Sequence, residues 1–308
     1  MIYTVTLNPS LDYVVDVKDF CVGAVNRSGR EVILPGGKGI NVSLMLKALG
    51  CETRAMGFLA GFTGKEIRRL LFEEGLPEDF LFTENGFSRI NVKLKSEEET
   101  EINGAGPQIS AEEREALLMK LEGMLREGDT LVISGSAPRS LGSDIYAEML
   151  RRVSGRSVRV AVDISGSALW ELLPFRPFLV KPNHHELGEL FGVCIRSADD
   201  AVFYAHKLAE RGAENVLVSL AGDGAVLVTE SGVHYAAAPE GTVVNSVGAG
   251  DSAVAGFLAG MLSGKGEAYA LSLAVAAGSA TAFSEGIAKK EDVFSLREQV
   301  KIAELNAE

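Results

Sequence analysis

Short, continuous runs of Val, Ile and Leu alternate with longer helical patterns along most of this 308-residue chain. A strand buried on both faces has such an unbroken apolar run, and the helical stretches between supply the crossovers that parallel strands require. The pattern predicts an α/β protein with a mostly parallel central sheet covered by helices on both faces. The expected strands are 1–7, 130–133, 158–162, 178–180 and 216–218. The expected helices are 40–49, 64–74, 111–126, 143–153, 198–211, 252–262 and 268–283.

No boundary divides the chain into separate domains. It has no Pro- or Ser-rich linker, no low-complexity tract and no internal repeat at solenoid spacing. A hydrophobic content of 46% is ample for a sizeable core. We therefore expect a single domain over residues 1–308.

Polar residues follow several of the expected strands. In open parallel sheets, ligands bind beyond the carboxyl ends of the strands. The polar residues at these ends are Ser134 and Ser136, Asp163, Lys181 and Asn183, and Ser219. We expect a ligand site along this edge.

The segment 245–252 (NSVGAGDS) opens directly into an apolar helical run. Small residues at a helix start expose backbone N–H groups and the positive end of the helix dipole, which together hold a phosphate. Asp251 would repel a resting phosphate, so we interpret it as the group that accepts a proton from an attacking hydroxyl. The alternative is that Asp251 only caps an ordinary core helix.

A second glycine cluster, 35–43 (PGGKGINVS), also precedes a helical pattern. Its spacing is that of neither a P-loop nor a complete dinucleotide fingerprint. Such a turn allows the backbone to approach a sugar closely, while Lys38 and Asn41 hydrogen-bond its hydroxyls or phosphate. The alternative is a purely structural turn.

The segments at about 12–34 and 87–104 predict a small sheet that closes over the ligand as a lid. Polar and apolar residues alternate strictly over 89–94, which places Arg89, Asn91 and Lys93 on one face and Ile90, Val92 and Leu94 on the other. The apolar face needs covering. The alternative is that these are ordinary strands of the main sheet.

Taken in order, these motifs resemble the ribokinase-like, or PfkB, carbohydrate kinases, and the match runs nearly from end to end. Further segments typical of the branch acting on phosphorylated ketohexoses are 6–12 (TLNPSLD), 88–93 (SRINVK), 101–104 (EING), 134–136 (SGS) and 181–186 (KPNHHE). The resemblance implies a ribokinase-like three-layer α/β/α fold with a small β-sheet lid. It implies ATP-dependent phosphorylation of a ketohexose monophosphate, with fructose 1-phosphate expected first and tagatose 6-phosphate or fructose 6-phosphate as alternatives.

The resemblance also implies roles for residues. Asp251 is the expected catalytic base, and Gly248, Ala249 and Gly250 supply backbone donors to the transferred group. The residues expected to bind the sugar phosphate are Asp12, Gly37, Lys38, Asn41, Asn103 and Ser136, with Arg89 on the phosphate and Lys93, Arg27 and Arg139 as weaker candidates. The residues expected near ATP are Lys181, Asn183, Ser219, Gly222, Gly224 and Gly278, with 274–283 lining the adenine pocket. Glu186 is expected to hold Mg²⁺, directly or through water. Family members often pair their lids, so a homodimer through the lids is expected.

Composition excludes several other classes. A net charge of −12 argues against a nucleic-acid or acidic-membrane surface, which needs clustered Lys and Arg. No apolar run reaches membrane-spanning length, and the start lacks the pattern of a signal peptide. Three scattered cysteines favour reduced thiols in a cytoplasmic protein. Adjacent His184 and His185 are expected to point apart, which argues against a metal site there.

Two alternatives from other classes remain. A dinucleotide-dependent oxidoreductase requires a Gly-rich turn after the first strand, where this chain has Asn8-Pro9. A non-catalytic sugar-phosphate sensor could lose the base or the glycines of the phosphate loop, and both are present.

Overall fold

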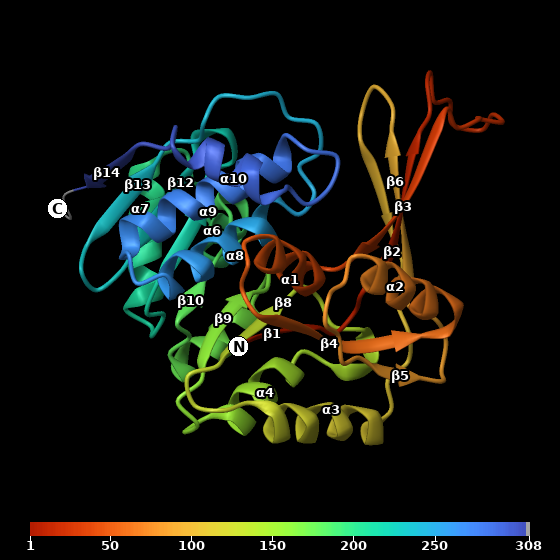
Figure 1. The fold of residues 1–308 in the computed structure, drawn as a ribbon, viewed down its shortest axis with the longest axis horizontal. Helices are drawn as coiled ribbons and strands as arrows, with labels where there is room; N and C mark the ends of the chain where they lie inside the picture. Colours follow the sequence, from red (N-terminus) through yellow and green to blue (C-terminus); the bar gives the residue numbers. More distant parts are fainter. Residues whose placement is uncertain (306–308) are drawn as a thin grey trace.

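The computed structural model describes residues 1–305, and its centre is a ten-stranded sheet in the order β14-β13-β12-β11-β10-β9-β8-β1-β4-β5. The seven strands from β11 to β5 are parallel, and β12, β13 and β14 extend the sheet in antiparallel fashion (Figure 1). Their bounds are β1 (Ile2–Thr6), β4 (Thr53–Ala60), β5 (Leu81–Thr83), β8 (Thr130–Ser134), β9 (Arg159–Asp163), β10 (Leu179–Val180), β11 (Val216–Ser219), β12 (Ala225–Val228), β13 (Val233–Ala236) and β14 (Ile302–Leu305).

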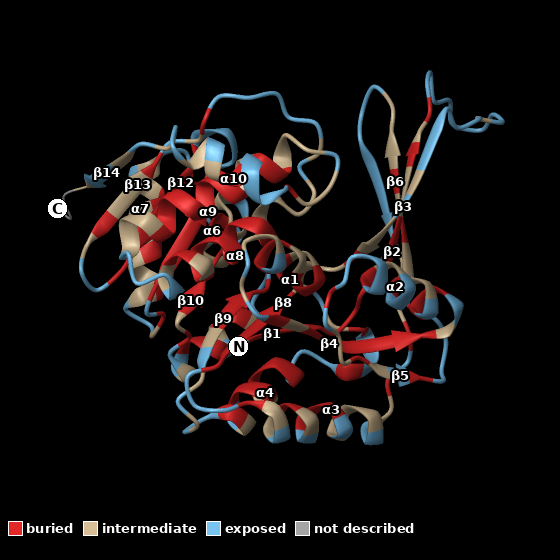
Figure 2. Ribbon diagram, in the orientation of Figure 1, coloured by how far each residue is buried: buried red, intermediate tan, exposed pale blue. Residues whose placement is uncertain are grey.

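Helices cover both faces of this sheet, so the expected three-layer fold is confirmed (Figure 2). One face packs on α1 (Lys38–Ala48), α8 (Ala249–Leu262), α9 (Glu267–Ala282) and α10 (Lys290–Arg297). The other packs on α3 (Ala111–Met124), α4 (Ile145–Val153), α5 (Ala168–Leu172), α6 (His184–Phe191) and α7 (Ala198–Ala209). Helix α2 (Gly61–Glu73) packs with α1 and β4. No helix within residues 1–305 is long and apolar enough to cross a membrane.

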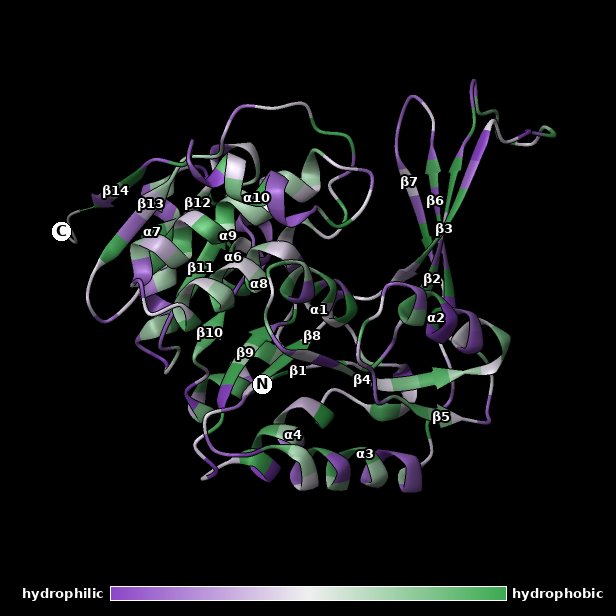
Figure 3. Cartoon of the chain, viewed as in Figure 1, coloured by the Kyte–Doolittle hydropathy of each residue, from purple (hydrophilic) through white to green (hydrophobic). Residues whose placement is uncertain are grey.

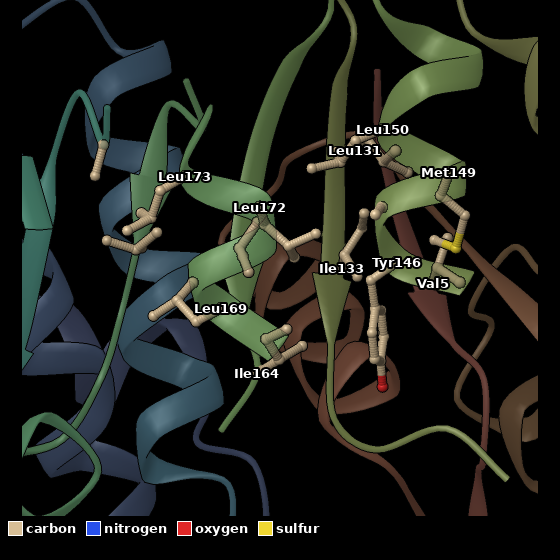
Figure 4. Packing of buried hydrophobic residues seen from close by; sticks show 14 of the residues in the cluster. Val5, Leu131, Ile133, Tyr146, Met149, Leu150, Ile164, Leu169, Leu172 and Leu173 are labelled. Atoms are coloured by element: carbon tan, nitrogen blue, oxygen red, sulfur yellow. The ribbon is translucent and has the colours of Figure 1, made fainter. Parts of the chain in front are cut away.

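Residues along one strand alternate between these two apolar layers. Leu131 and Ile133 of β8 belong to the cluster drawn in Figure 4, while Val132 between them packs on the opposite side. Burial on both sides explains why β8 to β11 consist largely of apolar residues, seen as green ribbons in Figure 3.

A separate four-stranded sheet in the order β3-β2-β6-β7 stands beside the main body (Figure 1). It consists of β2 (Ser10–Asp16), β3 (Arg30–Gly36), β6 (Arg89–Lys95) and β7 (Thr100–Asn103). Asn91 and Lys93 are buried, whereas Ile90, Val92 and Leu94 are half-buried, so the two faces differ as the alternation predicted. The alternative that these strands belong to the main sheet is wrong.

Some elements differ from the sequence expectations. Helices α1 and α8 begin at Lys38 and Ala249, a few residues early, because Gly37 and Gly248 adopt φ of 123° and 80° and serve as their N-caps. The elements not predicted are β4, β5, β12 to β14, α5, α6 and α10. The capping box that Asn183 and Glu186 form at the start of α6 was a readable signal for that helix.

The expectation that His184 and His185 point apart is wrong. Their ring centroids lie 3.9 Å apart in the first turn of α6. The 100° rotation between helix neighbours is too small to separate two large rings that both lean towards one side.

Candidate active site

Asp251 lies in the first turn of α8 and is only 6% exposed. The N-cap of this helix is Gly248, so Asp251 does not occupy the capping position. Asn41 of α1 donates from Nδ2 to Asp251 Oδ2 at 2.8 Å. The two glycine-rich segments, 210 residues apart in sequence, therefore meet at one carboxylate.

The surroundings of Asp251 favour its protonated form. Burial raises its pKa to about 6, and the neighbouring Asp163 carboxylate adds to the shift. Lys38, the Asn41 hydrogen bond and Lys181 oppose it without cancelling it. A carboxylate with this pKa is well matched to proton transfer near neutral pH.

Two lysines and two carboxylates lie near Asp251. Asp163 Oδ1 is 3.2 Å from Lys38 Nζ and 3.4 Å from Lys181 Nζ, and Glu186 Oε1 is 3.8 Å from Lys38 Nζ. Burial raises the pKa of Asp163, but the two lysines outweigh it and hold the pKa below its usual value. Burial lowers the pKa of Lys38, but the carboxylates of Asp163, Asp251 and Glu186 raise it by more, so the net shift is upward. Lys38 therefore stays positively charged next to Asp251.

Asp12 of β2 is buried in the small sheet and held by three polar neighbours. Its Oδ1 accepts from Ser10 Oγ at 2.6 Å and from Asn91 Nδ2 at 3.0 Å, and its Oδ2 lies 3.5 Å from Lys93 Nζ. A Cβ at position 36 would come within 2.5 Å of the Asp12 carboxyl, so Gly36 permits this approach. Ser10 and Asn91 were not among the predicted site residues, although the alternation in β6 could have indicated Asn91.

Arg89, at the start of β6, is held by the segment that joins β1 to β2. Its Nε donates to the Asn8 carbonyl at 3.0 Å, and burial lowers its pKa. The Asn8 side chain donates to the Ala105 carbonyl at 3.2 Å. Asn8 therefore ties both ends of the β6-β7 hairpin to the segment that follows β1.

Of the remaining predicted sugar-binding residues, Lys93 is buried and the others are exposed. Lys93 is buried between Asp12 and Glu101, at 3.5 Å from each carboxylate. Asn103 is exposed on β7, and Ser136 and Arg139 are exposed beyond the end of β8. Arg27 is exposed in the segment joining β2 and β3, which Figure 1 shows at the tip of the small sheet. Within one chain, Arg27 therefore lies away from Asp251.

A cavity of about 690 Å³ opens at the start of α8, beside the residues that precede Asp251. The predicted nucleotide residues Asn183, Ser219, Gly222, Gly224 and Gly278 line it, as do Ala249 and Gly250. Six residues of 274–283 form part of its wall, namely Ala274, Val275, Gly278, Ser279, Ala282 and Phe283. His184, His185, Pro239 and Val243 also line it and were not predicted to do so.

The residues present suit a hydrated Mg²⁺ better than a fully protein-bound metal. Within residues 1–305, no three His, Cys, Asp or Glu side chains are grouped to hold a metal ion. Mg²⁺ usually keeps several waters and takes one or two carboxylates plus phosphate oxygens. Glu186, which follows the cavity-lining His185, and the buried Asp163 Oδ2, which has no hydrogen-bond partner within residues 1–305, fit that requirement.

Comparisons with known proteins agree with this geometry. A family model described as pfkB family carbohydrate kinase matches residues 5–292. The chain is 52% identical to the 1-phosphofructokinase of Bacillus subtilis, over 99% of this chain and 100% of that protein. It is 37% identical to the D-tagatose-1-phosphate kinase of Bacillus licheniformis, over 99% and 100%. Phosphofructokinase-2 from Escherichia coli in complex with fructose-6-phosphate superposes with a TM-score of 0.90 at 28% identity, over 97% and 98%.

Proposed function

We propose, since the chain belongs to the pfkB family of carbohydrate kinases and such kinases use ATP, that it phosphorylates fructose 1-phosphate to fructose 1,6-bisphosphate. The observation that carries the proposal is the buried Asp251, held by Asn41 and flanked by a helix N-terminus and two lysines. The identity of 52% with a 1-phosphofructokinase over the full chain supports this acceptor. The identity of 37% with a D-tagatose-1-phosphate kinase favours an acceptor phosphorylated at the first carbon over the tagatose 6-phosphate alternative.

The base acts on the terminal hydroxyl opposite the existing phosphate. Asp251 orients this hydroxyl and accepts its proton as the oxygen attacks the γ-phosphoryl group of ATP, while the bond from that group to the β-phosphate breaks and ADP leaves. The transition state is loose, so positioning and charge contribute more than strong basicity.

Backbone donors and lysines stabilise the charge on the transferred group. The N–H groups of Gly250 and Asp251 lie in the first turn of α8, where a helix has no intrahelical acceptor for them. Ala249 already donates to the Ser246 carbonyl at 3.3 Å, which makes it a weaker donor to a ligand. Lys38 and Lys181 add positive charge. Mg²⁺ accompanying ATP on the Glu186 side would neutralise phosphate charge.

The sugar lies between the small sheet and the carboxyl ends of the main strands in this proposal. Asp12, Asn41 and the backbone at Gly37 bind its hydroxyls, and Arg89 binds its phosphate through the guanidinium nitrogens not used by Asn8. Lys93 holds Asp12 in place, since both its carboxylate neighbours belong to the small sheet.

The outer face of the small sheet supports a homodimer. Ile33, Tyr13, Val92 and Ile102 lie in one row across its four strands, and Ile33 and Ile102 are 48% and 65% exposed. A second copy of this sheet would cover the row. We place the enzyme in the cytoplasm, where ATP is available and its three free cysteines stay reduced.

The test is kcat/KM with Mg-ATP for fructose 1-phosphate, tagatose 1-phosphate, tagatose 6-phosphate and fructose 6-phosphate. Fructose 1-phosphate should give the highest value. A preference for another acceptor would change the substrate within the same chemistry. Binding without turnover of any of the four would favour a non-catalytic sugar-phosphate regulator.

A further inference from the structure

The small sheet contacts the main body at Asn8 and also beside the cavity proposed for ATP. Arg30 of β3 donates from Nη1 and Nη2 to the two carboxylate oxygens of Glu285, at 2.8 and 2.7 Å. Lys95, at the end of β6, donates to the Val244 carbonyl at 3.4 Å. Both contacts join the small sheet to segments that follow β13 and α9 in the chain.

Those two segments, 243–246 and 282–286, are hydrogen-bonded to one another, and we call them the rim. The N–H groups of Val244 and Asn245 donate to the Ala282 carbonyl at 2.8 and 3.1 Å. The Asn245 side chain donates to the Glu285 carbonyl at 3.0 Å. The rim is therefore one hydrogen-bonded unit.

The rim has a nucleotide side and a lid side. Val243, Ser246 and Phe283 line the cavity proposed for ATP. Glu285 and the Val244 carbonyl instead face the small sheet. A ligand that orders the rim from the cavity side also fixes the groups that hold the small sheet.

We propose that the Arg30-Glu285 pair is a latch that couples nucleotide binding to closure of the small sheet over the sugar phosphate. The proposal rests on the kinase function and lid role proposed above. Arg30 and Glu285 are positioning residues, because both act on the small sheet and neither contacts Asp251. Coupling between two ligands is reciprocal, so sugar phosphate should tighten nucleotide binding by the same factor.

The exposure of the pair makes the latch separable from folding. The Arg30 and Glu285 side chains are 54% and 68% exposed, and pairs exposed to this degree contribute little to overall stability. Their replacement should therefore leave the fold intact and change lid position alone.

The coupling factor is the ratio of two dissociation constants for fructose 1-phosphate, without and with Mg²⁺ plus a non-hydrolysable ATP analogue, measured by calorimetry. Arg30→Ala and Glu285→Ala should each lower this ratio by about 2-fold to 5-fold, as expected for an exposed bidentate pair. The double variant should show no further loss. Exchange of the charges, Arg30→Glu with Glu285→Arg, should restore part of the ratio. The kcat at saturation of both substrates should change much less than the KM for fructose 1-phosphate measured at low ATP.

Arg69→Ala is the matched control, because Arg69 is equally exposed but pairs with Glu66 and Glu73 within α2. Its coupling factor should equal that of the wild type. A wild-type factor of one, unchanged factors in both latch variants, or an equal fall in the control would overturn the latch while leaving the kinase activity standing. Absence of wild-type turnover of all four sugar phosphates would instead overturn the proposed function, and the latch with it.

Discussion

At the scale of single residues, Asp251 keeps its carboxylate where water solvates it poorly, with Asn41 as its hydrogen-bond donor. Asp251→Asn retains the size and the hydrogen bond but removes proton acceptance. We expect kcat to fall by about 10²-fold to 10⁴-fold, with the KM for both substrates changing much less. Steady-state kinetics test this. A kcat within a few-fold of the wild type would show that Asp251 is not the base.

The raised pKa of Asp251 also means that its ionised form destabilises the folded protein at pH values above about 6. Its folded-state pKa of about 6 lies above the ordinary value of 3.8, so the folded state binds this proton more tightly than the unfolded chain. Its contribution to stability is therefore lost as the pH rises from about 4 to about 6.

We expect Asp251→Asn to match the wild type in free energy of unfolding near pH 4 and to exceed it by roughly 2–3 kcal/mol at neutral pH. Urea denaturation at both pH values measures this difference. The wild-type kcat should also fall below pH about 6 as the base becomes protonated. A variant that is less stable than the wild type at neutral pH would contradict the assignment of a poorly solvated carboxylate.

Arg89 is positioned by the Asn8 carbonyl through Nε, which leaves its other nitrogens for the sugar phosphate. Arg89→Ala removes a charge-assisted contact of about 1.5–3 kcal/mol, so the sugar-phosphate KM should rise by about 10-fold to 100-fold. The KM for ATP should stay nearly constant. Kinetics with each substrate varied in turn separate the two, and a defect confined to ATP would remove this assignment.

At the scale of helices, α8 and α9 both contribute to the candidate site, and they pack closely against each other at Gly256 of α8. Asp251 lies on α8, while Gly278 and Phe283 near the end of α9 line the cavity. A Cβ at Gly256 would come within 2.5 Å of the Leu273 carbonyl oxygen and 2.9 Å of the Ala274 Cα. Both are backbone atoms, so the helices would have to move apart.

Gly256→Ala should therefore destabilise the protein by about 1–3 kcal/mol, the usual cost of overpacking. The ATP KM should rise as well, since α9 carries part of the cavity wall. Urea denaturation gives the stability. Gly123→Ala is the control, because Gly123 is exposed on α3 with no atom within 4 Å of an added Cβ. That change should stabilise by up to about 1 kcal/mol through helix propensity, and equal effects of the two variants would contradict the packing argument.

At the scale of the whole molecule, the apolar row on the small sheet is the surface expected to join two chains. Val92→Asp would bury an unpaired carboxylate in that interface and shift dimer to monomer. The monomer should be a poor enzyme, since an unsupported sheet holds Arg89 and Asp12 less firmly over the substrate. Sedimentation and kinetics test both points. A wild-type protein that is monomeric and fully active would rule the dimer out.

The sequence alone was sufficient for features that depend on local pattern. The unbroken apolar runs predicted the parallel strands from β8 to β11, because burial on both faces acts on every residue of such a strand. Alternation in 89–94 predicted which side of β6 is polar. The capping box at the start of α6 was also readable in the sequence. Strands β4, β13 and β14 were missed because polar residues or glycine interrupt their apolar pattern. Strand β12 has an unbroken apolar run like those of the predicted strands and was missed all the same.

Only the tertiary structure decided the chemistry of the site, because a pKa and a hydrogen bond depend on distance in space. The sequence singled out Asn41 and Asp251 separately, while folding joined them at 2.8 Å. The same holds for Asp163, whose position between Lys38 and Lys181 brings together three strand or helix ends. Burial and the Asp163 carboxylate raise the pKa of Asp251 to about 6 against the opposing effects of Lys38, Asn41 and Lys181, and no pattern along the chain encodes that sum.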